Sequence, residues 1–201
     1  MKNLLLTVLL IGTVSFTNPE SDSKKADVSF GINYLEGTLK QLENEVKNLS
    51  QEELMYVPKE GGWSIMNCLE HIASTEPAII DGAKKIIQKN EVISSKDLKQ
   101  NDGIVIANVT NRGNKVKTPK PFEPTNKYSS VEDVLKVIKE QRASTIKLLK
   151  ETNSDLRHLF GEYPYGEVDA YQLILVSGAH GYRHTLQIRD ILKEIESNNS
   201  K

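Results

Sequence analysis

Apolar side chains recur every three to four residues in four long stretches of the chain, and this period predicts four amphipathic helices. In the first stretch the steps alternate between four and three, which is typical of helices that pack at a shallow angle. Charged residues fall outside this seam. Its apolar positions are Val28, Ile32, Leu35, Leu39, Leu42, Val46 and Leu49.

The second helix is expected to begin at Ser64, a residue type that caps helix N-termini well. A connector over residues 51–62, with turns at Pro58 and at two glycines, precedes it. Two polar residues depart from its apolar pattern, because Glu76 falls within the apolar sector and His71 lies at the sector's edge. The apolar positions are Ile65, Leu69, Ile72, Ile79, Ala83, Ile86 and Ile87.

The third helix follows Ser130, and Arg142 interrupts its apolar side. This arginine could reach an internal carboxylate such as Glu76 or extend to water along its aliphatic stem, and we favour the second arrangement. The buried positions of this helix are expected to be Val131, Val134, Leu135, Ile138, Thr145, Leu148 and Leu149.

The fourth helix is predicted from about Ala170 to Ser197, and its core-facing seam contains two histidines. Four residues separate His180 from His184, so both rings project from one face about a turn apart. Gly178 and Gly181 thin the same surface, which predicts either a close approach of another helix or a cavity. The other seam positions are Leu173, Ser177, Gln187 or Ile188, Ile191 and Ile195.

The connections between the helices are less regular. Residues 104–109 are predicted to form a short strand or an apolar loop segment, within a long connection that spans residues 90–130. This connection is either a lid over one end of the bundle or a surface excursion. Residues 163–166 read as a turn, and His158 as a surface or packing histidine.

Four amphipathic helices without a convincing strand pattern predict an all-α four-helix bundle over residues 28–197, with the long connection between helices 2 and 3. Lys2 precedes a short apolar run at residues 4–11, which predicts a signal peptide over residues 1–17 and an exported protein. A buried N-terminal helix is the alternative. Residues 18–27 read as a linker, and no stable membrane span is expected after signal removal.

Composition narrows the classes of partner. The chain of 201 residues carries 26 basic and 27 acidic residues, mixed along the sequence without a basic block. A nucleic-acid partner is therefore not indicated. Cys68 is the single cysteine, so no intramolecular disulfide is available. A homodimer is possible, although no exposed apolar stripe points to one.

The candidate chemistry lies in three histidines at or near the predicted bundle interior: His71, His180 and His184. Three neutral imidazoles can hold a divalent ion and leave a position open, and such a donor set suits zinc, nickel, iron or copper. The alternative is that these rings hydrogen-bond to Glu76, Gln187, Tyr182 or backbone carbonyls. We do not count Cys68 as a ligand, since a lone helical cysteine is usually a small core residue.

Two motifs carry a resemblance to a known family. GWSIMNCLEHIASTE at residues 62–76 and HGYRHTLQI at residues 180–188 resemble the second-helix and fourth-helix motifs of the DinB-like superfamily. The resemblance implies a four-helix bundle with an unusual helix order and a divalent metal at one end. By position it assigns the metal ligands to His71, His180 and His184. The proline-rich part of the long connection, residues 119–124, also resembles the family.

The resemblance implies a metal-dependent enzyme that activates a thiol or water on an unknown small-molecule substrate. Known members include thiol-dependent S-transferases and isomerases, and others have been proposed as metal-dependent hydrolases. Glu76 is then a candidate for orienting a ligand or transferring a proton, and Gln187 for aligning a bound group. Export would make a thiol cosubstrate scarce and favour a hydrolase or a binding role. The alternative is a bundle that binds a metal or a small molecule without turnover.

Overall fold

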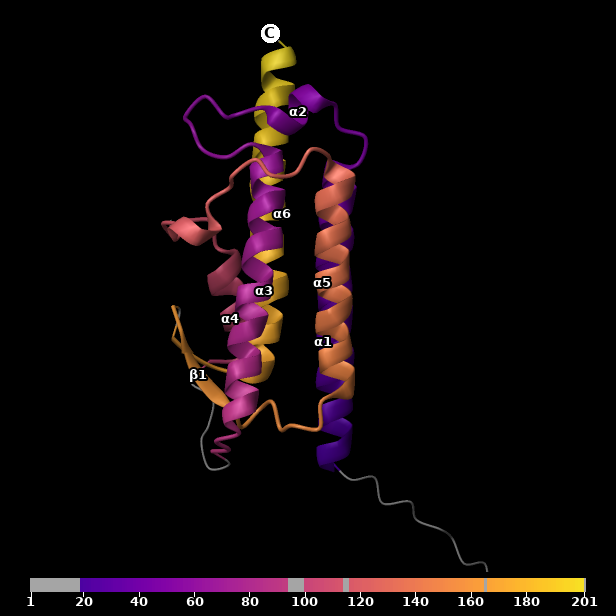
Figure 1. The fold of residues 1–201 in the computed structure, drawn as a ribbon, viewed down its shortest axis with the longest axis vertical. Coiled ribbons are helices and arrows are strands. Elements are labelled where there is room, and N and C mark those ends of the chain that lie inside the picture. Colours follow the sequence, from indigo (N-terminus) through magenta and orange to yellow (C-terminus); the bar gives the residue numbers. More distant parts are fainter. Residues whose placement is uncertain (1–18, 94–99, 114–115, 165, 201) are drawn as a thin grey trace, which may run out of the picture.

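The computed structural model of the protein describes residues 19–93, 100–113, 116–164 and 166–200, which fold into a four-helix bundle (Figure 1). The predicted fold class is confirmed. No helix of the described part is long and apolar enough to cross a membrane. The four bundle helices are α1 (Pro19–Val46), α3 (Ile65–Lys89), α5 (Val131–Glu151) and α6 (Ala170–Asn199).

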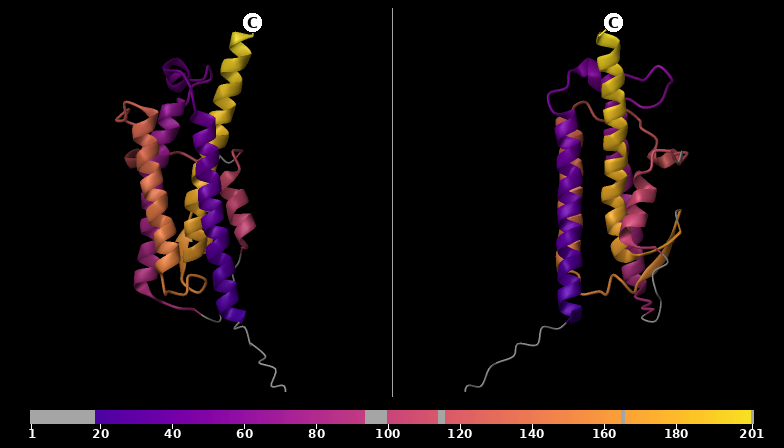
Figure 2. Two further views of the ribbon diagram at one scale, coloured as in Figure 1. Left: turned by 90° about the vertical axis from the view of Figure 1, so that its right-hand side faces the viewer. Right: turned by 180° about the vertical axis from the view of Figure 1, so that it is seen from behind.

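The direction of the helices explains the long connection. Helices α1 and α6 run one way along the bundle, whereas α3 and α5 run the other way (Figure 1). Because α3 and α5 are consecutive in this set and parallel, the chain must return along the bundle between them. It does so through α4 (Asp102–Thr110), which packs on the outer side of α6 (Figure 2), and a 3-10 turn, η1 (Lys120–Phe122).

Side-chain caps fix where the helices start. Ser64 accepts a hydrogen bond from the backbone N–H of Asn67, and the Asn67 side chain accepts one in return from the Ser64 N–H. Asp169 and Gln172 form the same reciprocal cap at the start of α6. The predicted start at Ser64 is therefore confirmed, and the reason is the capping chemistry expected of these residue types.

Four elements differ from the sequence prediction. The segment predicted as a linker, 18–27, is helical from Pro19 onward, and the predicted signal peptide lies outside the described residues. Residues 104–109 lie in helix α4 rather than in a strand or loop, because Val105 and Val109 are buried when the segment packs on α6. A short capped helix, α2 (Gln51–Met55), interrupts the predicted connector.

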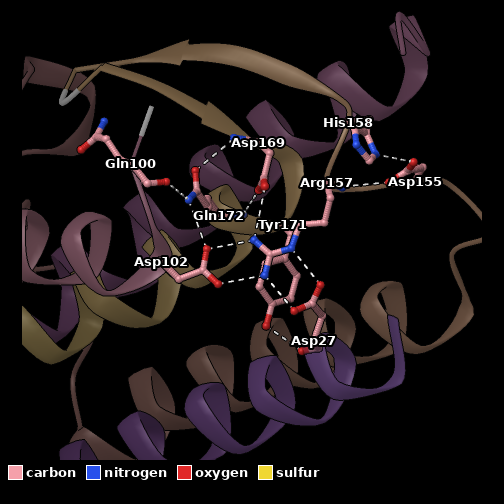
Figure 3. Close-up of polar contacts among 9 residues, drawn as sticks. All are labelled: Asp27, Gln100, Asp102, Asp155, Arg157, His158, Asp169, Tyr171 and Gln172. Carbon is pink, nitrogen blue, oxygen red and sulfur yellow. Dashed lines mark hydrogen bonds and ion pairs between the residues drawn. The ribbon is translucent and has the colours of Figure 1, made fainter. Parts of the chain in front are cut away.

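The fourth difference is a hairpin. Strands β1 (Phe160–Tyr163) and β2 (Gly166–Asp169) pair antiparallel around the predicted turn. His158, which precedes them, is partly exposed and contacts Asp155, with 2.7 Å between its Nδ1 and the carboxylate Oδ2 (Figure 3). Pro164 lies in a turn, as the sequence predicts, whereas strands of four residues are too short to give an alternating pattern.

A cluster of three aspartates around Arg157 fastens the end of the bundle next to the hairpin (Figure 3). The guanidinium donates two hydrogen bonds to Asp27 of α1 and two to Asp102 of α4, and one to Asp169 at the start of α6. The ring of Tyr171 lies 4.0 Å from the guanidinium carbon. Asp27 lies one residue before the predicted seam of α1, so this ion pair ties the helix to the loop before the hairpin.

In the middle of the bundle, Arg142 of α5 is buried and paired with Glu76 of α3. Both side chains are 3% exposed. Arg142 donates from Nε to Oε2 of Glu76 at 2.7 Å and from Nη2 to Oε1. The expectation that Arg142 extends to water is wrong, because its position faces the other three helices rather than the surface.

The remaining N–H groups of Arg142 reach the other two bundle helices. Nη1 donates to the Leu35 carbonyl and to Oγ1 of Thr38 in α1, and Nη2 donates to the Ser177 carbonyl in α6. A guanidinium has five N–H donors, and here each has an acceptor. This single side chain therefore joins all four bundle helices.

Two glycines of α6 make room for neighbouring side chains. A Cβ at Gly181 would lie 2.7 Å from both Arg142 Nη2 and Glu76 Oε1, and a Cβ at Gly178 would lie 3.0 Å from the ring of Tyr34. The sequence leaves open whether these glycines allow a close approach or line a cavity. At both positions, side chains of neighbouring helices approach the glycine closely. Gly181 is needed because the buried ion pair occupies the space of its missing side chain.

Helix α3 continues through Pro77 with help from α5. Proline has no N–H, so the carbonyl of Ala73, four residues earlier, loses its helical donor. The Gln141 side chain supplies the missing bond, with 3.0 Å between Nε2 and the Ala73 oxygen. An interhelical hydrogen bond thus replaces one that the helix cannot make.

Replacing Arg142 by leucine is expected to lower the free energy of unfolding by about 3–5 kcal/mol, because Glu76 would remain as an uncompensated buried charge. Changing Glu76 to leucine as well should recover most of this loss. Urea titrations of both variants and the wild type test the expectation. A double variant no more stable than Arg142→Leu would contradict it.

Replacing Gln141 by alanine is expected to cost about 1–2 kcal/mol, because the buried Ala73 carbonyl is left without a donor. In a Pro77→Ala background the new N–H at position 77 can serve that carbonyl, so the same replacement should cost less. A double-mutant cycle in urea measures the difference. Equal costs in the two backgrounds would mean that Gln141 stabilises the bundle by some other contact.

Candidate metal centre

The structure brings together the three histidines that the sequence singles out. His71 comes from α3, whereas His180 and His184 lie one turn apart on α6. One nitrogen of each ring lies within 4.8 Å of the others. His71 and His184 are 5% and 6% exposed, and His180 is partly exposed. The helix pair that carries the cluster, α3 and α6, is the most extensively packed pair of the bundle.

Hydrogen bonds fix the tautomer of two of the rings. Nδ1 of His71 lies 2.8 Å from the carbonyl oxygen of Phe122. A carbonyl only accepts, so Nδ1 carries the proton and Nε2 keeps its lone pair, which the Thr75 hydroxyl approaches at 3.4 Å. Nδ1 of His184 lies 3.1 Å from Oε1 of Gln187, which also accepts from Arg112. The same reasoning gives His184 a free Nε2.

The third ring, His180, has a buried nitrogen without a partner. Its Nδ1 makes no hydrogen bond within the described part of the chain. A buried polar atom left in this state costs free energy. A divalent ion held by three imidazole nitrogens would remove that cost, so the donor set fits the metal that the sequence predicts.

The alternative in which hydrogen bonds satisfy the histidines holds only in part. Phe122 and Gln187 accept bonds from Nδ1 of the two rings, and at Nε2 of His71 the Thr75 hydroxyl makes a long contact of 3.4 Å. Both carboxylate oxygens of Glu76 accept from Arg142. Gln187 therefore contacts a predicted ligand directly, whereas Glu76 lies in the ion pair beside Gly181.

Burial keeps all three rings neutral. Loss of hydration lowers the pKa of His180 to about 3, and the charge of Arg183, like a proton on His71, acts in the same direction. Burial also holds the pKa of His184 well below its ordinary value and lowers that of His71, against an opposing effect of the bond to Phe122. Neutral imidazoles keep the lone pairs that a metal needs.

Sequence reasoning missed the aromatic wall of the site. The ring centroid of Trp63 lies 4.6 Å from that of His71 and 5.8 Å from that of His184, with the second pair stacked. Its place directly before the Ser64 cap was the available signal. Cys68 stays outside the cluster of ligand atoms, and burial raises the pKa of its thiol to about 12. It is a core residue, as expected.

Comparison with known proteins places this geometry in context. The family model of the DinB superfamily matches residues 34–188. The uncharacterized protein YuaE of Bacillus subtilis (strain 168) is 29% identical over 156 residues, which cover 76% of this chain and 91% of YuaE.

A solved structure shares the fold. YfiT from Bacillus subtilis, a probable metal-dependent hydrolase with an unusual four-helix bundle topology, aligns with a TM-score of 0.57 and 13% sequence identity. The alignment covers 90% of this chain and 91% of YfiT. At this identity the likeness concerns the arrangement of the helices.

The free energy of unfolding of the metal-free protein is expected to fall as the pH drops below about 6.5. The folded pKa values of the three histidines lie below the ordinary value of 6.5, so the unfolded chain binds protons first. The stabilisation is complete above pH 6.5 and is lost as the pH falls toward 3. Urea titrations with a chelator at a series of pH values test this, and His180→Leu should flatten the dependence. An unchanged slope in that variant would contradict the assignment.

Proposed function

The chain belongs to the DinB superfamily, and from this premise we propose that it is a metal-dependent hydrolase whose divalent ion is held by His71, His180 and His184. The observation that carries the proposal is the set of three neutral rings whose nitrogens lie within 4.8 Å of one another. The choice of hydrolysis is supported by YfiT, a probable metal-dependent hydrolase that shares the fold. Zinc, nickel and iron suit three imidazole ligands.

A divalent ion in such a centre supplies a Lewis acid that lowers the pKa of bound water or thiol. The protein's own contribution is to hold and orient the ligands. Gln187 and the Phe122 carbonyl fix the two Nδ1–H tautomers, and ligand orientation of this kind supports metal affinity. Trp63 covers one side of the cluster and keeps water from that side.

Glu76 acts in this scheme as a positioning residue. Sequence reasoning offers it for ligand orientation or for proton transfer, and its contacts favour the first role, since Arg142 occupies both carboxylate oxygens. The pair lies against Gly181, next to His180 in α6. Glu76 thereby fixes the part of α6 from which His180 projects.

The second candidate function is thiol-dependent S-transfer at the same centre. The buried Cys68 cannot supply the thiol, so a low-molecular-weight thiol would have to enter as a cosubstrate. We also propose that the protein is exported through the signal peptide predicted at residues 1–17. An exported protein meets less thiol, which favours hydrolysis. A bundle that only binds a metal or small molecule is the third outcome of the test.

The purified protein is expected to contain one divalent ion per chain and to hydrolyse activated esters or amides in a metal-dependent way. His71→Ala and His184→Ala should each lower kcat/KM at least about 100-fold, because a ligand of the Lewis acid is lost. His158→Ala is the matched control, since its side chain is 38% exposed, pairs with Asp155 and lies outside the histidine cluster. Metal analysis and initial rates are the measurements.

Other results would redirect the assignment. Turnover only with an added thiol and an electrophile would favour S-transfer. Stoichiometric metal without turnover in either assay would favour the binding role. Hydrolysis that persists equally in the two histidine variants would contradict a three-histidine centre.

A further inference from the structure

A proline-rich segment of the long connection lies against the metal centre. We call residues 119–126 the strap. It contains the 3-10 turn η1 and three prolines, Pro119, Pro121 and Pro124, which restrict the backbone. The Phe122 carbonyl of this strap accepts the hydrogen bond from Nδ1 of His71. A ligand ring on α3 is therefore oriented by a segment that is remote in the sequence.

Glu70, the neighbour of His71 on α3, holds the same strap further along. Its Oε1 accepts from the N–H and from Oγ1 of Thr125, each at 2.8 Å, and its Oε2 accepts from the N–H of Asn126 at 2.8 Å. Glu70 is 5% exposed. Burying a carboxylate is costly unless hydrogen bonds compensate it. Here three donors of the strap do so.

A third contact closes the arrangement. The amide of Asn67, one turn before Glu70 and His71, donates from Nδ2 to Oδ1 of Asn126 at 2.8 Å. Asn126 has a φ of 60°, a left-handed conformation that asparagine tolerates better than most residues. The first turns of α3 thus hydrogen-bond to the strap through Asn67, Glu70 and His71.

The environment of Glu70 argues against an ordinary surface role. No ion pair found within the described residue ranges involves this carboxylate. Both oxygens are directed at backbone and hydroxyl donors of the strap. The contacts of Glu70 therefore serve to keep the strap docked beside His71.

We propose that Glu70 is a positioning residue of the metal centre, and that docking of the strap and binding of the metal are coupled through His71. With the strap docked, the Phe122 carbonyl holds the proton on Nδ1 and directs Nε2 to the other two histidines. With the strap released, the ring loses this orientation. The inference rests on the three-histidine centre of the proposed function, but not on hydrolysis.

Coupling of this kind is reciprocal. If docking raises the affinity for the metal by some factor, then the metal favours docking by the same factor. Loss of an orienting partner of a metal ligand typically weakens binding 10- to 100-fold. The strap should accordingly become more resistant to opening when the metal is bound.

Titration of the purified chain with Co²⁺, followed by its visible absorption, tests the role of Glu70. Glu70→Gln places an amide donor where Asn126 also donates, and it is expected to weaken Co²⁺ binding about 10- to 100-fold. Glu53→Gln is the matched control, because Glu53 also accepts capping hydrogen bonds but belongs to α2. Equal affinities of Glu70→Gln and the wild type would overturn the proposal.

Hydrogen exchange of the Thr125 and Asn126 amides in the wild type gives a second measurement that needs no variant. Zn²⁺ should slow their exchange, and by reciprocity the factor is at least as large as the loss of Zn²⁺ affinity in Glu70→Gln. If Glu70→Gln does not fold, Thr125→Val removes only the hydroxyl donor and should weaken Co²⁺ binding several-fold.

The outcomes separate the two proposals. Metal binding that leaves the exchange of both amides unchanged would overturn the coupling alone. A wild-type chain that binds neither ion would overturn the metal centre and the coupling together. Coupling without hydrolysis would leave the role of Glu70 intact and remove only the proposed activity.

Discussion

The buried ion pair of Arg142 and Glu76 is the constraint on which the bundle depends. Two charges removed from water are stabilising only if their geometry is close to ideal and every remaining donor is satisfied. Arg142 meets this condition by bonding to α1, α3 and α6 from its own position on α5. The register of four helices is thereby tied to one side chain. Gly181 follows from the same constraint, because the pair fills the space that any larger residue would need.

The metal centre combines local and remote orientation. Gln187 lies on the same helix as His184 and three residues further on, so helix geometry brings the two side chains together, and Arg112 of the crossover donates to the same amide oxygen. The partner of His71 is a backbone carbonyl that arrives from the crossover connection. The ligand on α3 is thus oriented directly by the returning chain, whereas the returning chain reaches His184 only through Gln187. The parallel course of α3 and α5 makes that return unavoidable, and it places the strap where α3 can use it.

The sequence predicts the bundle and the histidine cluster well because both depend on periodicity. His180 and His184 stand at core-facing positions, and such positions are visible without a structure. Whether the Arg142 side chain points into the bundle or to water is not visible in the sequence, because it depends on the hydrogen-bond acceptors of the neighbouring helices. Residues 104–109 form a helix because α6 provides a surface for Val105 and Val109, although their β-branched composition favours a strand. The roles of Glu70 and Phe122 were not predicted, because their contacts join two segments that lie about 50 residues apart in the sequence and involve backbone groups.

The position of the three histidines has a consequence for the lifetime of the folded chain. His71 and the pair on α6 are separated by the crossover, α5 and the hairpin, so one ion bound between them would close a very long loop. Ions that bind only the folded form stabilise it by mass action, to a degree set by their free concentration relative to the dissociation constant. The ion is then a removable cross-link. The abundance of the folded protein would rise and fall with the supply of metal, independently of any turnover at the site.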